Sequence, residues 1–368
     1  MNHTFTLDFL SKYRSQLMIN SKNKISFSTK VSILSFVLCC GVVSQHVKWT
    51  CRDIEWLNAL QSFWFFIVET CVPFFFMISG YLFFRTYQSC RWREKLWSRA
   101  KSLLVPYLLW NVFYAVVMLS LQKLGAITNM QSINGIYEGV ISCVNSEFSP
   151  LWFVKYLMVF ACISPLMYFV LRNMFLGAMT ILVLLLINVY NYYSGNMQVP
   201  LNVNANNWIM FIYQYVFFAI GAYGALCFKQ QIEFPSNMKS KVGICVLLLL
   251  ITFYFGYITH FGDVITNHTF RWLWCISLWF TCDLLPEIKV RSWMKYSFFI
   301  YCAHMIFVMC FQGTTSIIYM ETAGLKPFLQ ISEYLWLPVL LIYILIKTGD
   351  ILKSRIPRFW GLITGSRG

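Results

Sequence analysis

The chain has 368 residues, of which 58% are hydrophobic, 19% aromatic and only 12% charged. Soluble domains carry about 25% charged residues, so this composition excludes an ordinary soluble protein and indicates a polytopic membrane protein. The net charge of +15 would suit nucleic-acid binding, but the basic residues cluster between apolar runs, which indicates membrane topology instead.

Residues 1–30 form a basic lead that precedes the first apolar run. This lead has no apolar core of its own, so we expect no cleavable signal peptide and an uncleaved first membrane helix. Its mixture of apolar and charged residues fits either an amphipathic helix on the inner leaflet or a disordered tail.

Apolar runs of spanning length recur from residue 31 to residue 352. Hydropathy predicts ten transmembrane helices, near 31–47, 60–84, 102–121, 151–171, 173–190, 207–228, 242–259, 269–285, 296–312 and 333–352. With the N-terminus inside, 23 of the 29 Lys and Arg residues fall in cytoplasmic segments, and five, Arg271 among them, fall in outer loops. This asymmetry predicts an all-α membrane domain over 31–352, two cytoplasmic termini and a basic cytoplasmic tail over 353–368.

Two charged side chains fall well within predicted spans, away from their ends, where charge is costly and often marks function. They are Glu69, just before the stretch CVPFFFMISGYLFF (71–84), and Lys155. One interpretation is that these two residues pair with each other as structural glue between helices. His304 also lies inside a span, where it fits either a helix-to-helix hydrogen bond or a site residue.

His46 lies at the outer end of the first span, which serine and glutamine residues interrupt. Such a helix is better placed against protein or a polar cavity than against lipid. Glu69 lies roughly 13 Å below the outer end of the second span, at about 1.5 Å per residue. His46 and Glu69 are therefore predicted to line one outward-opening cavity, although position alone also fits a histidine wetted by headgroups. Pro73 and Gly80 suit this prediction, because proline kinks a helix and glycine allows close packing.

Five stretches follow one another in a recognisable order. They are VPFFFMISGYLFF (72–84), LLVPYLLWN (103–111), PLWFVKYL (150–157), FFAIGAYGAL (217–226) and YSFFIYCAH (296–304). Together they resemble the signatures of the acyltransferase family 3 integral membrane proteins, over residues 31–352. The resemblance implies a multi-pass protein of the plasma or inner membrane. It also implies transfer of an acyl group, usually acetyl, from cytoplasmic acyl-coenzyme A to a hydroxyl of an extracytoplasmic glycan or lipid-linked glycan.

The resemblance further implies a catalytic histidine at the end of the first span, and His46 matches it. A neutral imidazole can take the proton of a sugar hydroxyl near neutral pH, so His46 is the predicted general base. Glu69 is predicted to orient His46 or to stabilise its protonated form, and an acyl-histidine relay is the alternative mechanism. Two positions depart from the family's pattern. Ser35 stands where a basic residue is usual, with Lys30 as the nearest cation, and Glu69 stands where the family is often basic.

Six basic residues against one acid fill the predicted inner loop between the second and third spans. The positive-inside rule accounts for part of this cluster, and its density also suits the phosphates of an acyl-coenzyme A donor. The pantetheine arm of that donor is predicted to run past Ser79 toward His46. The predicted substrate-binding and donor-binding residues are Arg85, Arg93, Arg99, Lys101, Ser79, Trp152, Lys155 and His304.

No metal site and no bound cofactor are predicted, because acyl-coenzyme A is a substrate. The outer segments near 122–149 and 191–206 are polar and rich in asparagine, which suits a sugar acceptor. A homo-oligomer is compatible with the sequence. The main alternative is a transporter or flippase for a glycan or lipid-linked intermediate, which would bury charges in the same way. A catalytically silent relative and a member of the other membrane-bound O-acyltransferase superfamily are further alternatives.

Overall fold

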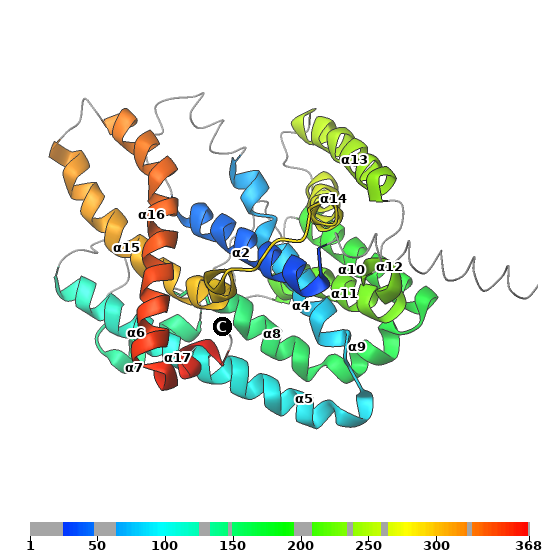
Figure 1. Cartoon of the computed structure of the whole chain (residues 1–368), viewed down its shortest axis with the longest axis horizontal. Coiled ribbons are helices and arrows are strands. Elements are labelled where there is room, and N and C mark those ends of the chain that lie inside the picture. The colour runs from blue at the N-terminus through cyan, green and yellow to red at the C-terminus, as the bar shows by residue number, and fades with distance from the viewer. Residues whose placement is uncertain are drawn as a thin grey trace, which may run out of the picture.

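The computed structural model describes residues 25–47, 64–124, 133–145, 149–194, 208–233, 238–258, 264–321 and 326–366 (Figure 1). These residues form helices and contain no β-strand. The α-helices are α2 Phe27–His46, α4 Cys71–Phe84, α5 Trp92–Arg99, α6 Val105–Lys123, α7 Ile136–Val144, α8 Trp152–Cys162, α9 Ser164–Leu171, α10 Met174–Tyr193, α11 Trp208–Cys227, α12 Lys229–Glu233, α13 Met238–Ile258, α14 Val264–Cys282, α15 Ser297–Glu321, α16 Lys326–Arg355 and α17 Pro357–Thr364. Most of the predicted N-terminal lead lies outside the described residues.

Seven described helical stretches are long and apolar enough to cross a membrane. They are Phe27–His46, Trp64–Phe84, Ser89–Lys123, Met174–Tyr193, Ile209–Cys227, Ser292–Phe311 and Leu335–Arg355. The pair α8 and α9, bent by 67°, adds an eighth when it is counted as one span. The predicted all-α, polytopic membrane fold is therefore confirmed. The predicted spans near 242–259 and 269–285 coincide with α13 and α14, which do not reach the same criterion in the part of the chain described, so the count of ten stays a prediction.

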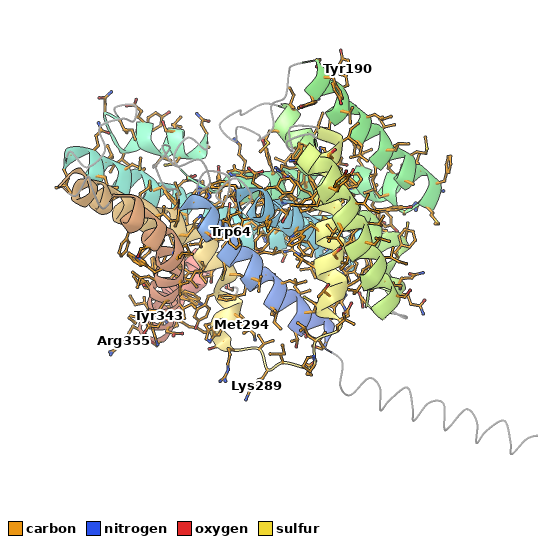
Figure 2. All side chains as sticks on the ribbon, turned by 90° about the horizontal axis from the view of Figure 1, so that it is seen from above. Trp64, Tyr190, Lys289, Met294, Tyr343 and Arg355 are labelled. Carbon is orange, nitrogen blue, oxygen red and sulfur yellow. The ribbon has the colours of Figure 1, made fainter. Side chains whose placement is uncertain are left out.

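Side chains that the topology prediction assigns to opposite sides of the membrane lie at opposite edges of the molecule (Figure 2). Lys289 and Arg355, both predicted to be cytoplasmic, lie toward one edge, and Met294 lies near them. Tyr190, near the predicted outer end of α10, lies at the other edge. The orientation of the helices in the membrane stays a prediction.

The backbones of α4 and α11 are in direct contact. A Cβ atom on Gly80 of α4 would collide with the carbonyl oxygen of Phe218, and one on Gly221 of α11 with the carbonyl oxygen of Met77. Small residues allow this approach, and packing contacts then hold helices together in lipid, where no hydrophobic effect acts between them. The prediction that Gly80 allows a neighbour to pack closely is confirmed.

The second span is interrupted at Glu69 and Thr70, between a helical turn at 64–68 and α4. Pro73 accounts for the interruption, because it has no N–H to donate to the carbonyl group of Glu69, four residues earlier. Thr70 donates its hydroxyl hydrogen to the carbonyl oxygen of Ile67 at 2.6 Å. The predicted proline kink is thus realised as a break that sets the Glu69 side chain at a bend.

The predicted inner loop between the second and third spans is largely helical. A 3₁₀ segment (Ser89–Arg91), α5, a π-helical segment (Ala100–Leu104) and α6 follow one another as one helical stretch, Ser89–Lys123. The π segment precedes Pro106, whose missing N–H and ring disturb the regular hydrogen-bond ladder. The basic residues of this region are therefore held on a helix.

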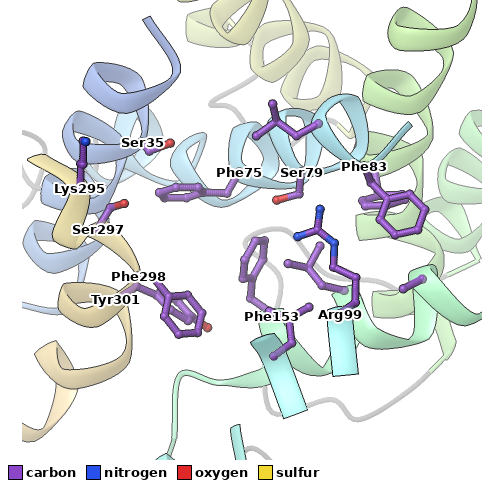
Figure 3. A pocket seen from close by; sticks show the side chains of 15 residues that line it. Ser35, Phe75, Ser79, Phe83, Arg99, Phe153, Lys295, Ser297, Phe298 and Tyr301 are labelled. Carbon is purple, nitrogen blue, oxygen red and sulfur yellow. The ribbon is translucent and has the colours of Figure 1, made fainter. Parts of the chain in front are cut away.

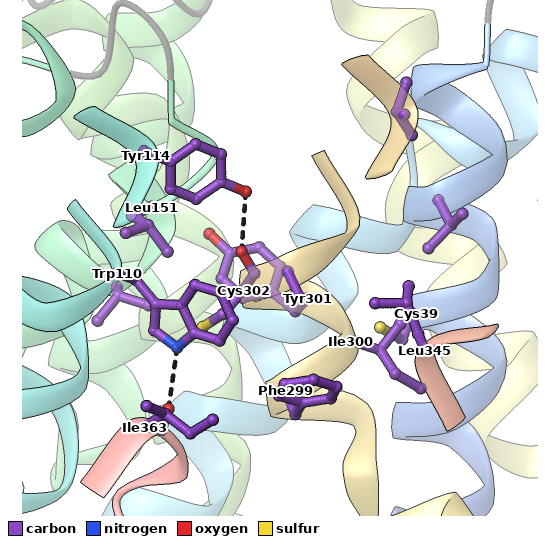
Figure 4. Close-up of a cluster of buried hydrophobic side chains, with 14 of the residues drawn as sticks. Cys39, Trp110, Tyr114, Leu151, Phe299, Ile300, Tyr301, Cys302, Leu345 and Ile363 are labelled. Carbon is purple, nitrogen blue, oxygen red and sulfur yellow. Dashed lines mark hydrogen bonds between the residues drawn. The ribbon is translucent and has the colours of Figure 1, made fainter. Parts of the chain in front are cut away.

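The helix α15 belongs to a large buried cluster that also contains residues of α6 and α17 (Figure 4). Tyr114 of α6 donates a hydrogen bond to the carbonyl oxygen of Cys302 at 2.8 Å. The indole of Trp110 donates to the carbonyl oxygen of Ile363 at 2.9 Å. Part of the predicted basic tail is thus a packed helix, α17, and α15 is held firmly at the level of Cys302.

Candidate active site

His46 and His304 face each other across the contact between α2 and α15. Their ring centroids are 5.1 Å apart, with the ring planes inclined by 44°. Seven residues earlier in each helix, the thiol of Cys39 donates to the carbonyl oxygen of Ser297 at 3.2 Å. Seven residues are two helical turns, so two parallel helices in this register bring both histidines to the same interface.

The ring of His304 is completely buried, and its tautomer is fixed by its own helix. Nδ1 lies 2.6 Å from the carbonyl oxygen of Tyr301, one turn earlier. A carbonyl oxygen only accepts, so Nδ1 carries the proton and Nε2 carries the lone pair. Nε2 has no hydrogen-bond partner among the described residues. The protein therefore keeps an unused acceptor nitrogen beside His46.

A cavity of about 300 Å³ is lined by Tyr301, which is one helical turn before His304 on α15 (Figure 3 shows the cavity). Its lining residues are Ser35, Phe75, Ser79, Leu82, Phe83, Arg99, Leu103, Phe153, Leu157, Ala161, Phe218, Lys295, Ser297, Phe298 and Tyr301. Tyr301 lines the cavity and is three residues before His304, and its hydroxyl donates to the carbonyl oxygen of Pro150. Tyr301 thus adjoins both the cavity and the histidine pair, with its ring centroid 6.1 Å from that of His304.

This cavity, named the donor cavity after the acyl donor that the resemblance implies, has apolar walls and two cationic side chains. Arg99 lies beside Ser79 and Phe83 on one wall, while Lys295 lies beside Ser35 and Ser297 on the other (Figure 3). No acidic side chain is found among its described lining residues. The four ion pairs of the described residues join Lys30 to Asp283, Arg85 to Glu233, Arg91 to Glu94, and Arg271 to Glu69. Arg99 and Lys295 belong to none of them, so the cavity has an uncompensated positive field suited to an anion.

Of the predicted binding residues, the structure brings Ser79 and Arg99 together in the donor cavity. Arg93 lies on α5 and lines a neighbouring cavity that Arg99 also lines. Lys101 is exposed, with its ammonium 5.2 Å from the centroid of the Trp97 ring. These three cations come from one helical stretch, where the sequence analysis predicted an inner loop.

Arg85 has a structural partner instead. Its guanidinium forms two hydrogen bonds to the carboxylate of Glu233, at 2.7 and 3.1 Å, and Tyr81 donates a third at 2.9 Å. Burial of Glu233 favours the neutral acid, but the hydrogen bonds from Arg85 and Tyr81 outweigh it and lower the pKa of Glu233. The bidentate pair therefore joins the end of α4 to α12 and occupies the guanidinium of Arg85.

Trp152 and Lys155 lie beside the donor cavity rather than in it. Trp152 packs on Phe76, with ring centroids 6.1 Å apart, and the next residue, Phe153, lines the cavity in its place. The ammonium of Lys155 lies 3.4 Å from the carbonyl oxygen of Val144. Helix α8 begins at Trp152, and its rotation decides which of these residues faces the cavity.

Glu69 forms an ion pair that the sequence analysis did not predict. Its carboxylate lies 2.6 Å from Nη2 of Arg271, and Nη1 of Arg271 donates to the hydroxyl of Tyr213 at 2.5 Å. The proposed pairing of Glu69 with Lys155 is therefore wrong. The assignment of Arg271 to an outer loop is wrong as well, because α14 begins at Val264 and buries Arg271 to 5% exposure. The predicted span near 269–285 started too late, because the charge of Arg271 lowers the hydropathy at the N-terminal end of α14.

His268 lies on the same helix and was missed for the same reason. Its ring is 4% exposed and packs between Tyr213 and Phe217, with centroids 4.6 and 5.8 Å away. Neither ring nitrogen has a hydrogen-bond partner within the described residues. Glu69, Arg271, Tyr213 and His268 therefore form a buried polar cluster between α4, α11 and α14.

Lys30 is not placed to serve the donor cavity. Its ammonium pairs with Asp283 at 2.6 Å and lies 3.7 Å from the centroid of the Trp279 ring. The cation that shares the cavity with Ser35 is Lys295. From the sequence alone, Lys295 is one of the 23 cytoplasmic Lys and Arg residues that predict the membrane topology, and no role in a site is predicted for it. The spacing of Ser297, Tyr301 and His304 by four and three residues places them on one helical face, and this pattern could have identified the α15 wall.

Comparison with known protein families gives one result that bears on this site. The family model of the acyltransferase 3 type, described as an acyltransferase domain, matches residues 31–347. Comparisons with curated proteins and with solved structures gave no match. The matched segment contains both histidines and every residue that lines the donor cavity.

Proposed function

Because the chain belongs to the acyltransferase 3 family and is a membrane acyltransferase, we propose a specific transfer across the plasma or inner membrane. The donor is cytoplasmic acyl-coenzyme A, in the first instance acetyl-coenzyme A. The acceptor is a hydroxyl of an extracytoplasmic glycan or lipid-linked glycan. The observation that carries this proposal is the sequence of groups from the cations Arg99 and Lys295, through the donor cavity, to the pair His46 and His304.

The donor cavity suits the thioester arm of the donor in charge and in size. Arg99 is only partly exposed and has no carboxylate partner among the described residues, and partly buried charges normally have a counter-ion. A phosphate group of the donor would supply it. A volume of about 300 Å³ lies at the lower end for small-molecule sites, which fits a narrow arm and a short acyl group.

The histidine pair supplies the base that the transfer needs. As an acceptor hydroxyl approaches the thioester carbonyl, His46 takes the hydroxyl proton, and the hydroxyl oxygen bonds to the carbonyl carbon. The carbon–sulfur bond then breaks, and the leaving thiolate receives the proton, which gives an ester and free coenzyme A. His304 acts as a positioning residue, because its ring lies beside that of His46 and its Nε2 has no partner among the described residues. Tyr301 holds the ring of His304 in that tautomer.

The test is acyl transfer by the purified full-length protein in nanodiscs with radiolabelled acetyl-coenzyme A. The acceptors are water and, in a second arm, the surface glycans of the native cell. Wild type should release coenzyme A thiol and label the glycan, whereas His46→Ala should do neither while keeping its melting temperature within a few degrees. Equal transfer by His46→Ala, or no use of any acyl-coenzyme A by wild type, would overturn the proposal.

A further inference from the structure

A second cavity adjoins the donor cavity, between α5 and α8. Its volume is about 660 Å³, and its walls are Trp92, Arg93, Leu96, Trp97, Arg99, Ala100, Leu104, Met158, Ala161 and Cys162. Arg99 and Ala161 line both cavities, so the guanidinium of Arg99 lies at their boundary. We propose that this second cavity seats the nucleotide of the donor, while the donor cavity receives the pantetheine arm; this inference rests on the proposed function.

The sizes of the two cavities fit this division. The donor cavity, at about 300 Å³, lies at the lower end of the range of about 300–1,000 Å³ for small-molecule sites, so we assign only the narrow arm of the donor to it. The second cavity is about twice as large, at 660 Å³ against 300 Å³. A ligand that occupies both must pass Arg99, and the diphosphate is the part of coenzyme A that connects nucleotide and arm. Arg99 therefore meets the diphosphate.

The charge of the second cavity is positive without compensation. Arg93 and Arg99 are its charged lining residues, and no described acid lines it. The one acid of this helix, Glu94, pairs with Arg91 at 3.2 Å, and both side chains are well exposed. Arginine binds phosphate through a planar array of donors, so Arg93 and Arg99 are suited to separate phosphate groups of one ligand.

Two tryptophans give the same cavity a surface for a purine ring. Trp92 and Trp97 both line it, and Trp97 is 65% exposed, with the Lys101 ammonium 5.2 Å from the centroid of its ring. Stacking of a base on an aromatic side chain contributes about 1–3 kcal/mol. The indole N–H of Trp92 is buried and has no acceptor in the described part of the chain, so a ligand atom can satisfy it. Tryptophan also occurs at membrane interfaces, and the phosphate of a lipid headgroup is the other source of the same chemistry.

Arg91 offers a matched control for Arg93. The two residues lie two positions apart at the start of the same helix, but only Arg93 lines the second cavity. The experiment measures binding of coenzyme A, dephospho-coenzyme A and pantetheine to wild type, Arg93→Gln, Arg91→Gln and Trp97→Leu, each as the full chain in nanodiscs of neutral lipid. Both altered positions of the cavity are exposed, so the variants should fold.

We expect Arg93→Gln to weaken coenzyme A binding roughly tenfold or more, as loss of a charge-assisted hydrogen bond does. The affinity of Arg93→Gln for pantetheine should change less than twofold. Arg91→Gln should bind coenzyme A, dephospho-coenzyme A and pantetheine with the affinities of wild type. Trp97→Leu should weaken both nucleotide probes roughly fivefold and leave pantetheine unchanged.

Three outcomes overturn the inference. The first is wild-type affinity of Arg93→Gln for coenzyme A while wild type still transfers acyl groups, which would leave the proposed function standing. The second is a loss of pantetheine affinity in Arg93→Gln that equals its loss of coenzyme A affinity. The third is binding of phosphatidylglycerol, but not of coenzyme A, that depends on Arg93, which would assign the cavity to a lipid headgroup. If wild type neither binds coenzyme A nor uses its thioester, the proposed function itself fails.

Discussion

The carbonyl oxygen of Tyr301 accepts a hydrogen bond from Nδ1 of His304 at 2.6 Å, and this bond decides which nitrogen of the ring can act as a base. Because Nδ1 keeps its proton, the basic lone pair stays at Nε2, in a fully buried position next to His46. An unpaired acceptor in such surroundings is costly, so proteins keep one mainly where it has a use. We connect that use to the proton that leaves the acceptor hydroxyl.

His304→Gln should therefore lower kcat and leave donor binding intact. General acid–base groups raise the rate of the catalysed step roughly 10²–10⁴-fold. Loss of a residue that only positions such a group should lower kcat by about 10²-fold, the lower end of that range. Steady-state kinetics with acetyl-coenzyme A, together with direct binding of coenzyme A, would separate the two effects. A large loss of coenzyme A affinity with kcat preserved would instead make His304 a donor contact.

Glu69→Gln should destabilise the protein, because it leaves the buried guanidinium of Arg271 without its carboxylate. Removal of one partner of a buried ion pair lowers the free energy of unfolding by about 3–5 kcal/mol, whereas removal of both charges lowers it much less. Thermal unfolding in one detergent should show a large drop in melting temperature for Glu69→Gln and partial recovery for Glu69→Gln/Arg271→Gln. If Glu69→Gln unfolds like wild type but loses activity, Glu69 acts on His46, as the sequence analysis expected.

Gly80→Ala and Gly221→Ala should each prevent the close contact of α4 and α11. The added methyl group meets a backbone carbonyl oxygen that no rotamer change can move. The free energy of unfolding should therefore fall by about 3 kcal/mol, the upper end of the range for overpacked cores. Gly243→Ala on α13 is the matched control, because a Cβ there has no neighbour within 4 Å. A melting temperature of Gly80→Ala equal to that of Gly243→Ala would show that the two backbones do not touch.

Lys295→Gln and Lys30→Gln should have opposite profiles. Lys295 lines the donor cavity beside Ser35, so its loss should weaken coenzyme A roughly three- to tenfold with little change in stability. Lys30 is buried and pairs with Asp283, so its loss should lower the melting temperature and leave coenzyme A affinity nearly unchanged once the protein is folded. The reverse pattern would mean that Lys30, and not Lys295, compensates for the serine at position 35.

Much of the architecture follows from the sequence because it rests on local chemistry. The apolar runs identify an all-α membrane protein, Pro73 produces the break of the second span, and Gly80 marks the contact with α11. The ordered motifs identify the family. Each of these features depends on residues that are close together in the chain.

The partners of charged residues could not be predicted, because they depend on how helices distant in the sequence pack. Glu69 and Arg271 are 202 positions apart, and only the packing of the second span against α14 brings them together. Lys295 faces the same cavity as Ser35 for the same kind of reason. The predicted span near 269–285 also began too late along α14, so the burial of His268 and Arg271 was not predicted.

Proteoliposomes in which the cytoplasmic face of the protein points outward would test the central proposal most directly. Acetyl-coenzyme A that carries a label on the acetyl group is supplied outside, with water as the acceptor, and the positions of coenzyme A and labelled acetate are measured. The account predicts that free coenzyme A stays outside while labelled acetate accumulates in the lumen, and that His46→Ala abolishes both products. Release of coenzyme A and labelled acetate on the same side would contradict it.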